Sequence, residues 1–452
     1  MKKIFMENEV VKNLVEKAGL FSSDNSAQVT FVYGCNVNAT AFLNTMSVVS
    51  GTEQFTCTFT TPIPKDYEVS YADEEKKVIV PYLTETFKVS DFLNIVGLLS
   101  GLGEMLYLKK MEDGLIKVGA KDNTVELPLE PLADDQKAMP IVVDRSKSMV
   151  NVNFAVPEFL EALRIGGCMV HKDSDEQRGL GNVLLSMEFE GKENAAVNGR
   201  IKVYSSNGNC LSRGECAAIF REDGISHKNL AEFLVANQMP NFKVGVPKKS
   251  QMKFLRLLKG VEKCSVIASD KHICALLDQG AMFTFVTGAN INSVSAVAKI
   301  IDEIQGKEKG VKVTCDNEGI KGKVDILNNV AKAKKCKNAL LLTITDKLLT
   351  MEISEKKGMG TVKVALGSSS VETGSKVKVY LDGDYLASAI ASIKKGNITI
   401  STEKADDYIK APVQFTTGDD DATSKEVVLL APMSGPKVKT EEGNETEALE
   451  EA

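Results

Sequence analysis

The sequence predicts an α+β fold of three similar domains, each built from two β-α-β-β-β halves with helices on one face of antiparallel sheets. Two observations lead to this prediction. First, 452 residues are enough for about three domains at roughly 100–200 residues each. Second, a unit consisting of a short alternating strand, a helix and several further strands recurs along the chain. Its three plainest copies begin at Phe87, Phe242 and Val377.

Each copy contains a predicted helix that ends at a glycine, and a related half precedes each copy. A glycine suits the C-cap position because it adopts left-handed backbone conformations without steric cost. The three glycines are Gly101, Gly260 and Gly396. The preceding halves begin near Ile4, Val152 and Val311. Any helix followed by strands can look self-similar by chance, but here the spacing, the glycine and the closing strand recur together.

The pattern lapses between copies, and these lapses give the domain boundaries. We expect a first domain at residues 1–145 with a divergent first half, a second at 146–290 and a third at 291–433. Ser295 to Ile304 predicts an amphipathic helix in the linker that opens the third domain. Residues 434–452 are acidic and of low complexity, so we expect them to be disordered.

Composition restricts the function classes. The formal charge is −6, and residues 441–452 hold six glutamates without a cation, so the rest of the chain is neutral. A generally basic nucleic-acid-binding domain would have a pI above about 9, whereas this chain has a pI near 5.5. Any basic surface must therefore be local.

Cysteine usage and hydropathy indicate a cytoplasmic protein. The nine cysteines are scattered and form no Cys-x-x-Cys pair, which favours reduced thiols over disulfides or zinc. The N-terminus lacks the apolar region of a secretory signal. No run reaches the roughly 18 apolar residues of a membrane span, so we expect no membrane partner.

The search for catalytic groups returns little. The three histidines, His171, His227 and His272, lack metal-ligand spacing, and the glycines near Arg178 and Gly358 do not complete a phosphate-binding motif. We therefore expect no enzyme activity, no metal and no cofactor. An enzyme with an unrecognised site is the weakest of the alternatives.

Positive charge is concentrated in the segment 247–263, which holds six cations against the single acid Glu262. Lys249, Lys253 and Arg256 lie on one predicted helical stripe, and Met252, Leu255 and Leu258 form an apolar one. Other predicted helices also carry cations. The candidate DNA-binding residues are Lys12, Lys17, Arg164, Lys248, Lys249, Lys253, Arg256, Lys259, Lys332, Lys335, Lys394 and Lys395.

These cations have two interpretations. They form the solvated faces of amphipathic helices, with some pairing to helix C-termini, or they contact a duplex that carries one negative charge per ~1.7 Å of its axis. Recurrence on the same element of each repeat favours DNA. Phosphate contacts carry no sequence information, so the expected partner is double-stranded DNA bound without sequence preference.

Two segments resemble a known family, the bacterial DNA polymerase III β subunits, or β sliding clamps. Arg178-Gly-Leu-Gly-Asn-Val-Leu-Leu, followed by Val203-Tyr-Ser-Ser-Asn-Gly-Asn-Cys-Leu, resembles a strand pair and turn of that family. Asn209 and Cys210 depart from the family's His and Arg. Val427-Val-Leu-Leu-Ala-Pro-Met resembles its closing strand and C-terminus.

The resemblance implies a ring-forming clamp fold without a cofactor. It implies a head-to-tail homodimer that encircles DNA, is opened by a clamp loader and tethers the replicative DNA polymerase through an apolar cleft. Carried over by position, the cleft is lined by Leu180, Ser206, Leu211, Leu429, Leu430, Pro432 and Met433. The alternatives are an ordinary edge strand at that place and, for the whole chain, a clamp-fold scaffold that recruits partners without encircling DNA.

Overall fold

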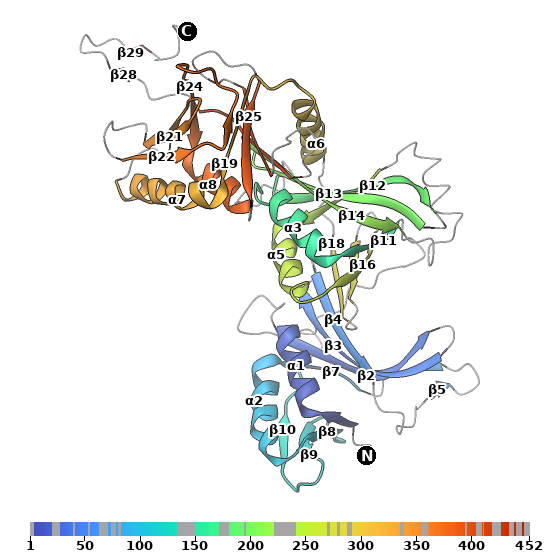
Figure 1. The fold of residues 1–452 in the computed structure, drawn as a ribbon. Helices are drawn as coiled ribbons and strands as arrows, with labels where there is room; N and C mark the ends of the chain where they lie inside the picture. Colours follow the sequence, from blue (N-terminus) through green and yellow to red (C-terminus); the bar gives the residue numbers. More distant parts are fainter. Residues whose placement is uncertain are drawn as a thin grey trace. The chain divides into compact units, whose positions relative to one another are not determined.

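The computed structural model describes most of the chain (Figure 1). The described residues are 4–19, 28–38, 41–52, 55–62, 71–73, 78–79, 83–132, 150–170, 180–193, 196–220, 241–268, 272–277, 281–286, 292–334, 339–353, 360–393, 396–403, 409, 411–417, 426–433, 438–439 and 445–446. Contacts divide the chain into two compact units. Unit 1 comprises residues 1–153, 222–231 and 253–287, and unit 2 comprises residues 154–221, 232–252 and 288–452.

Unit 1 contains a four-stranded antiparallel sheet and two helices that pack side by side. The strand order is β1 (Ile4–Glu7), β8 (Met105–Lys110), β9 (Ile116–Ala120) and β10 (Glu126–Leu129). The helices are α1 (Asn8–Gly19) and α2 (Val89–Leu99). α2 buries Val89, Phe92, Val96 and Leu99, which recur at helical spacing and so form a single face.

A second sheet of unit 1 joins strands that lie far apart in the sequence. Its order is β7 (Leu83–Lys88), β2 (Gln28–Asn38), β3 (Ala41–Thr52), β4 (Phe55–Pro62), β18 (Ala281–Val286), β17 (His272–Leu277) and β16 (Lys263–Ala268). In the β4–β18 pair, Phe55 lies opposite Phe285. The short strands β5 (Tyr71–Asp73) and β6 (Val78–Ile79) pair with each other.

Unit 2 contains a longer antiparallel series of the same kind. Its order is β15 (Asn241–Pro247), β12 (Asn182–Glu193), β13 (Ala196–Ser206), β14 (Cys210–Phe220), β27 (Val427–Leu430), β26 (Val413–Thr417), β25 (Asn397–Thr402), β19 (Val311–Asp316) and β23 (Ser368–Ser369). The helix α3 (Val156–Gly166) packs on β14 and carries Pro157 in its first turn, where proline is well tolerated.

The second sheet of unit 2 has the order β22 (Thr361–Ala365), β21 (Leu348–Ile353), β20 (Ala339–Ile344) and β24 (Val377–Asp382). The helices α7 (Asn317–Ala333) and α8 (Gly383–Ser392) pack against each other. Each begins at an aspartate cap: Asp316 accepts from the Gly319 amide at 2.8 Å, and Asp382 accepts from the Asp384 amide at 2.9 Å.

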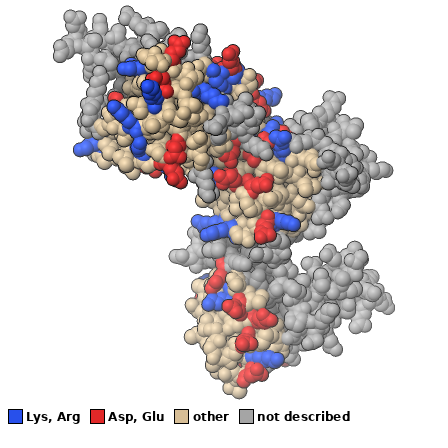
Figure 2. Space-filling model, in the orientation of Figure 1, with Lys and Arg blue, Asp and Glu red and all other residues tan. Residues whose placement is uncertain are grey.

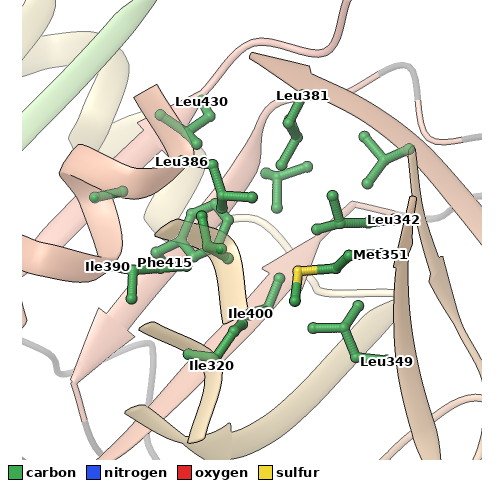
Figure 3. Close-up of a cluster of buried hydrophobic side chains, with 14 of the residues drawn as sticks. Ile320, Leu342, Leu349, Met351, Leu381, Leu386, Ile390, Ile400, Phe415 and Leu430 are labelled. Atoms are coloured by element: carbon green, nitrogen blue, oxygen red, sulfur yellow. The ribbon is translucent and has the colours of Figure 1, made fainter. Parts of the chain in front are cut away.

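The apolar core of unit 2 lies among these helices and sheets (Figure 3). Ile320 from α7 and Leu386 from α8 point toward Leu342 and Phe415 from the strands. All four side chains are fully buried. The alternating burial of β24 and the helical spacing of buried residues in α7 are the periodicities from which the sequence predicts these elements.

Five further elements complete the description. β11 (Val150–Ala155) and α5 (Lys248–Leu257) cross the sequence boundary between the units. α6 (Asn292–Gln305) contains the predicted linker helix, which is therefore confirmed. In the acidic segment 434–452, β28 (Val438–Lys439) pairs with β29 (Glu445–Thr446), and the other residues of the segment lie outside the described residues.

The predicted α+β class and the repeated strand–helix–strand units are confirmed, with two corrections at helix ends. Gly260 follows α5 in a left-handed conformation, at φ 82°. Gly396 is also left-handed, at φ 84°, but α8 ends at Ser392 with Ile393 as its C-cap, so the prediction that this helix ends at Gly396 is wrong. Gly101 instead lies inside a short 3₁₀ helix, Ser100–Leu102, that continues α2. The chain tightens there through hydrogen bonds and needs no left-handed residue. The three-domain division stays a prediction.

Candidate nucleic-acid and partner interfaces

α5 presents a basic face to solvent and an apolar face to the protein. Gln251 and Phe254 of α5 and Leu258 in the turn that follows it are buried and recur at helical spacing. Met252 is 51% exposed, so the prediction that it shares an apolar stripe with Leu258 is wrong. The periodicity of the sequence fits either of two adjacent stripes, and only packing decides between them.

The cations of α5 differ in exposure. Arg256 and Lys259 are exposed, and Lys248 and Lys253 are half-buried. The side chain of Lys249 lies outside the described residues. The helix has no acidic residue in its first turn. Lys248 and Lys249 stand in this first turn, at the end where the helix dipole is positive.

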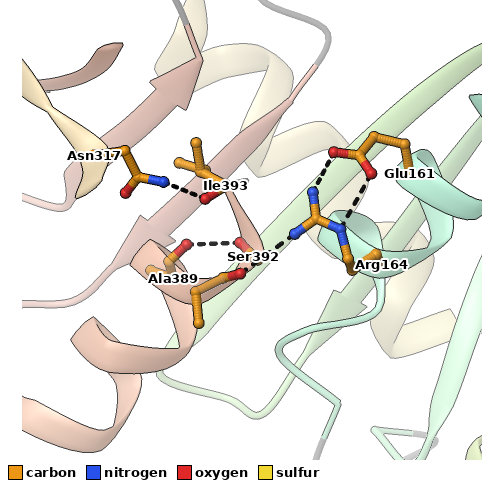
Figure 4. Close-up of polar contacts among 7 residues, drawn as sticks. Glu161, Arg164, Asn317, Ala389, Ser392 and Ile393 are labelled. Atoms are coloured by element: carbon orange, nitrogen blue, oxygen red, sulfur yellow. Dashed lines mark hydrogen bonds and ion pairs between the residues drawn. The ribbon is translucent and has the colours of Figure 1, made fainter. Parts of the chain in front are cut away.

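α1 and α3 carry fewer of the predicted DNA-binding cations than α5 does. Lys12 is exposed on α1, and the side chain of Lys17 lies outside the described residues. On α3, Arg164 pairs with Glu161 through two hydrogen bonds and donates a third to the backbone oxygen of Ala391 at 3.4 Å (Figure 4). The charge of Arg164 is therefore compensated within the chain, and its guanidinium connects α3 to α8.

α7 shows similar compensation. The Nζ of Lys332 lies 2.5 Å from Oδ1 of Asp384 at the start of α8. Lys335, Lys394 and Lys395 lie outside the described residues, so their predicted role is untested. Figure 2 shows Lys and Arg interspersed with Asp and Glu over the described residues of one face, without a continuous basic field.

The two segments that resemble the clamp family lie side by side in unit 2. β14 pairs with β27 so that Cys210 is opposite Leu430 and Leu211 is opposite Leu429. The chain then continues through Met433, whose amide donates to the Tyr380 oxygen at 2.8 Å. The sequence thus correctly predicts that these distant segments meet.

The predicted cleft residues divide into exposed and buried sets. Met433 is 37% exposed, and Leu180, Leu211 and Pro432 are half-buried. Three other members are at most 2% exposed, so a partner cannot contact their side chains in this conformation; they support the surface from below. These three are Ser206, Leu429 and Leu430.

The turn before β14 is held by polar side chains. The Ser206 hydroxyl accepts from the Gly208 amide at 3.0 Å, and the Asn207 side chain accepts from the Cys210 amide at 2.8 Å. Gly208 has φ 95°, which suits glycine, and a Cβ there would lie 3.9 Å from the side chain of Leu180. The turn and Leu180 therefore adjoin each other.

The sequence prediction missed the packing of α6 beside this surface. Ala298, Ile301 and Ile304 of α6 form a cluster with four strand residues, and Leu211 packs against it. The strand residues are Leu184, Tyr204, Val427 and Leu429. Nη1 of Arg213 lies 3.0 Å from Oδ1 of Asp302, which ties α6 to β14. Amphipathicity revealed the helix, but not the surface that it covers.

The described residues offer little for acid–base, redox or metal chemistry. Burial raises the pKa of the Cys168 thiol to about 11 and those of Cys210 and Cys315 to about 12, which disfavours the reactive thiolate. Among the described residues, no group of three or more His, Cys, Asp or Glu side chains is placed to bind a metal. No described helix is both long and apolar enough to cross a membrane.

No protein-family model matches the sequence, and no curated protein sequence matches it. Solved structures do match. The DNA polymerase sliding clamp from Bacillus subtilis aligns with a TM-score of 0.68 and 12% identity over 95% of this chain and 98% of that chain. The chain has the DNA sliding-clamp fold. The clamp fold extends over nearly the whole chain, and the predicted resemblance to β sliding clamps is confirmed at the level of structure.

Two further clamp-fold structures agree with this assignment. The DNA polymerase III subunit beta from Pseudomonas aeruginosa aligns with a TM-score of 0.68 and 12% identity over 96% of this chain and all of that chain. The beta subunit from DNA polymerase of Streptococcus pyogenes aligns with a TM-score of 0.67 and 14% identity over 96% of this chain and all of that chain. Identities this low establish the fold and leave function to be argued from the surface.

Proposed function

We propose that this chain is a DNA sliding clamp, a non-enzymatic ring that encircles duplex DNA and tethers a DNA polymerase to it. The observation that carries the proposal is the extent of the fold match, which covers 95–96% of this chain and 98–100% of the compared clamps. A ring requires all of its domains, so a match to a single domain would not suffice. The compared structures are DNA polymerase sliding clamps or β subunits.

Strand pairing supports firm junctions between the proposed domains. The β4–β18 ladder connects the proposed first and second domains, and the β14–β27 ladder connects the second and third. Backbone hydrogen bonds in such ladders resist bending more than flexible linkers do. The domains proposed are 1–145, 146–290 and 291–433, followed by the acidic segment 434–452.

Ring closure is proposed to join two copies head to tail. Among the described residues, β10 ends the first sheet of unit 1 and β22 ends the second sheet of unit 2. Unpaired edges of this kind can accept a strand from another chain. Pairing β10 of one copy with β22 of the next would close a ring after two copies with six domains.

The proposed DNA contacts are the helix cations, with Arg164 the least supported because Glu161 compensates it. Binding is to phosphates and lacks sequence preference. The clamp has no cofactor of its own, acts in the cytoplasm and is opened by a clamp loader. The proposed docking surface for polymerase and loader motifs is Leu180, Leu211, Pro432 and Met433, supported from below by Ser206, Leu429 and Leu430.

One observation favours a second candidate, a scaffold that recruits partners without encircling DNA. Acids of the same chain compensate Arg164 and Lys332, and the chain without its acidic end is electrically neutral. A surface with so little excess charge binds DNA weakly by electrostatics. A closed ring does not require strong contacts, however, because topology holds it on DNA.

Ligation can test encirclement without a clamp loader. The protein is mixed at high concentration with linear plasmid so that rings thread over the DNA ends. Half of the sample is then treated with DNA ligase, which closes the plasmid into circles, and the other half stays linear. Gel filtration in about 1 M salt, where the screening length is only ~3 Å, removes electrostatic binding. We expect protein to remain on circles and to leave linear DNA. Loss from both forms would favour the scaffold.

A further inference from the structure

The surface beneath α6 includes a row of side chains that crosses four strands. Leu184 on β12 lies opposite Tyr204 on β13, and Tyr204 lies opposite Arg213 on β14. Arg213 in turn lies opposite Val427 on β27. Directly opposed residues of a ladder point to the same face of the sheet, so these four side chains share one face. We call this row the α6 seat.

Leu211 joins the α6 seat to the proposed docking surface. It lies two residues before Arg213 on β14 and therefore on the same face, and it packs against the cluster beneath α6. The opposite face of β27 contributes Val428 and Leu430 to the main core of unit 2. The described side chains of α6 belong to the smaller cluster on the α6 seat and not to that core.

α6 contacts β12, β13 and β14 (Figure 1) through a small set of side chains. Ala298, Ile301 and Ile304 are buried at intervals of three residues. Nη1 of Arg213 lies 3.0 Å from Oδ1 of Asp302, and the side chains are 8% and 54% exposed respectively. A helix of 14 residues is only marginally stable in water by itself. The helical state of α6 and its contact with the seat therefore depend on each other.

The contacts of α6 show which chemistry fits the seat. The strands offer apolar side chains to a helix that carries apolar residues three positions apart. Arg213 favours a carboxylate beside the middle apolar residue, as Asp302 stands beside Ile301. A lysine or arginine at that position would face Arg213 with like charge, so the seat selects against basic segments.

We propose that α6 is a displaceable cover and that the α6 seat is a second docking site, which takes an amphipathic, carboxylate-bearing helical segment of a partner protein. The proposal rests on the proposed clamp function and deepens it, because Leu211 belongs to the surroundings of both sites. The tethered α6 competes at a high effective concentration, so only a segment that matches the seat displaces it.

A peptide copy of α6 is the probe for the full-length protein. A fluorescein-labelled peptide with the sequence of residues 292–309 is titrated with unmodified protein and with two variants, and its anisotropy is followed. Ile301→Asp charges the buried face of the tethered helix and leaves the seat unchanged. Ile300→Asp is the matched control, because Ile300 is 43% exposed and Ile301 is fully buried.

We expect the dissociation constant of the peptide to fall at least about 10-fold for Ile301→Asp and to stay within about 2-fold for Ile300→Asp, because only the first change weakens the tethered competitor. A second peptide keeps the three apolar residues and the aspartate but has other solvent-facing residues, as a partner segment would. It should bind equally well. Binding of the first peptide alone, or no difference between the two variants, would overturn the proposal.

Asp302→Asn is a milder variant that keeps the test decisive if thermal unfolding shows that Ile301→Asp does not fold. Asp302 is exposed, so this variant should fold. A peptide with the same change should bind it about 3-fold more weakly than the unmodified peptide, because the amide cannot form an ion pair with Arg213. Equal binding of the two peptides would contradict the expected carboxylate preference.

Hydrogen exchange on the unmodified protein tests displacement without a substitution. Saturating peptide should speed exchange of the tethered α6 amides and leave α7 unaffected. Unchanged exchange of α6 would overturn the proposal. DNA takes no part in these measurements, so their failure would leave the clamp function standing, and loss of protein from ligated circles would remove the clamp function without deciding the role of α6.

Discussion

Leu211 lies directly opposite Leu429 where β14 pairs with β27, although the two residues are far apart in the sequence. Leu429 is 2% exposed, and Leu211, half-buried, packs against the same cluster beneath α6. This pair lies at the proposed junction of the second and third domains and beside the proposed docking surface. The junction and the surface therefore share side chains.

Leu429→Ala tests the junction. Removing a buried leucine side chain leaves a cavity, and we expect a loss of about 2–5 kcal/mol in the free energy of unfolding. The control is Ile326→Ala on α7, where the isoleucine is 60% exposed and we expect a change within about 0.5 kcal/mol. Urea unfolding measures both. Equal effects would mean that the β14–β27 ladder is not packed as described.

Arg164→Gln separates a connecting role from a DNA contact. The guanidinium joins Glu161 to the Ala391 backbone oxygen, so its loss should lower the free energy of unfolding by about 1 kcal/mol. Its charge is compensated, so the slope of the logarithm of the DNA-binding constant against the logarithm of salt concentration should change by less than about 0.5. A slope change of about 1 with unaltered stability would instead support a direct phosphate contact.

Charges on the free edge of β22 should open the proposed ring. Thr361 and Ala365 are exposed, and aspartate at both positions would place carboxylates in a strand–strand interface. We expect the dimer dissociation constant, measured by analytical ultracentrifugation, to rise at least about 10-fold. A control that adds the same charge on α7, Lys321→Gln/Asn329→Asp, should leave it unchanged. A similar rise in the dissociation constant of the β22 variant and of the α7 control would mean that the subunit interface does not lie at β22.

Tyr107 gives a pH prediction. Burial, together with the 2.7 Å hydrogen bond that its hydroxyl donates to Oε1 of Glu126, raises the pKa of Tyr107 from 10.0 to about 12. The neutral phenol is therefore favoured in the folded state. Its contribution to stability is complete below pH 10 and is lost as the pH rises from 10 to about 12.

Tyr107→Phe removes both the hydrogen bond and this titration. At pH 9 the variant should be about 1 kcal/mol less stable than the unmodified protein. Between pH 9 and pH 11 the difference should shrink by about 1 kcal/mol, because the unfolded tyrosine ionises first. Urea unfolding at the two pH values measures the difference, and a constant gap would contradict the raised pKa.

Local elements were predictable from the sequence because their causes are local. The strand–helix units that begin near Phe87, Phe242 and Val377 correspond to β7–α2, β15–α5 and β24–α8. Apolar periodicity and turn residues specify such units within a short window. The C-cap predicted at Gly101 was wrong for the converse reason. Whether a helix ends in a left-handed residue or in a 3₁₀ turn depends on packing against neighbouring elements, which a short sequence window does not contain.

Burial at the proposed docking surface could not be predicted in the same way. The run Val427 to Leu430 is apolar on both faces, and the sequence does not say which element covers each face. α6 covers Leu429, so the sequence placed a buried residue in an open cleft. Met252 was misplaced for a related reason, since its exposure depends on how α5 sits on its neighbours.

Release from cut DNA tests encirclement most directly. Protein held on ligated plasmid in high salt is treated with a restriction enzyme that cuts the circle once, and the protein remaining on DNA is followed over time. The proposed clamp should stay on the uncut circle and leave after the cut by sliding off an end. Protein that stays after cutting, or leaves intact circles equally fast, would contradict encirclement.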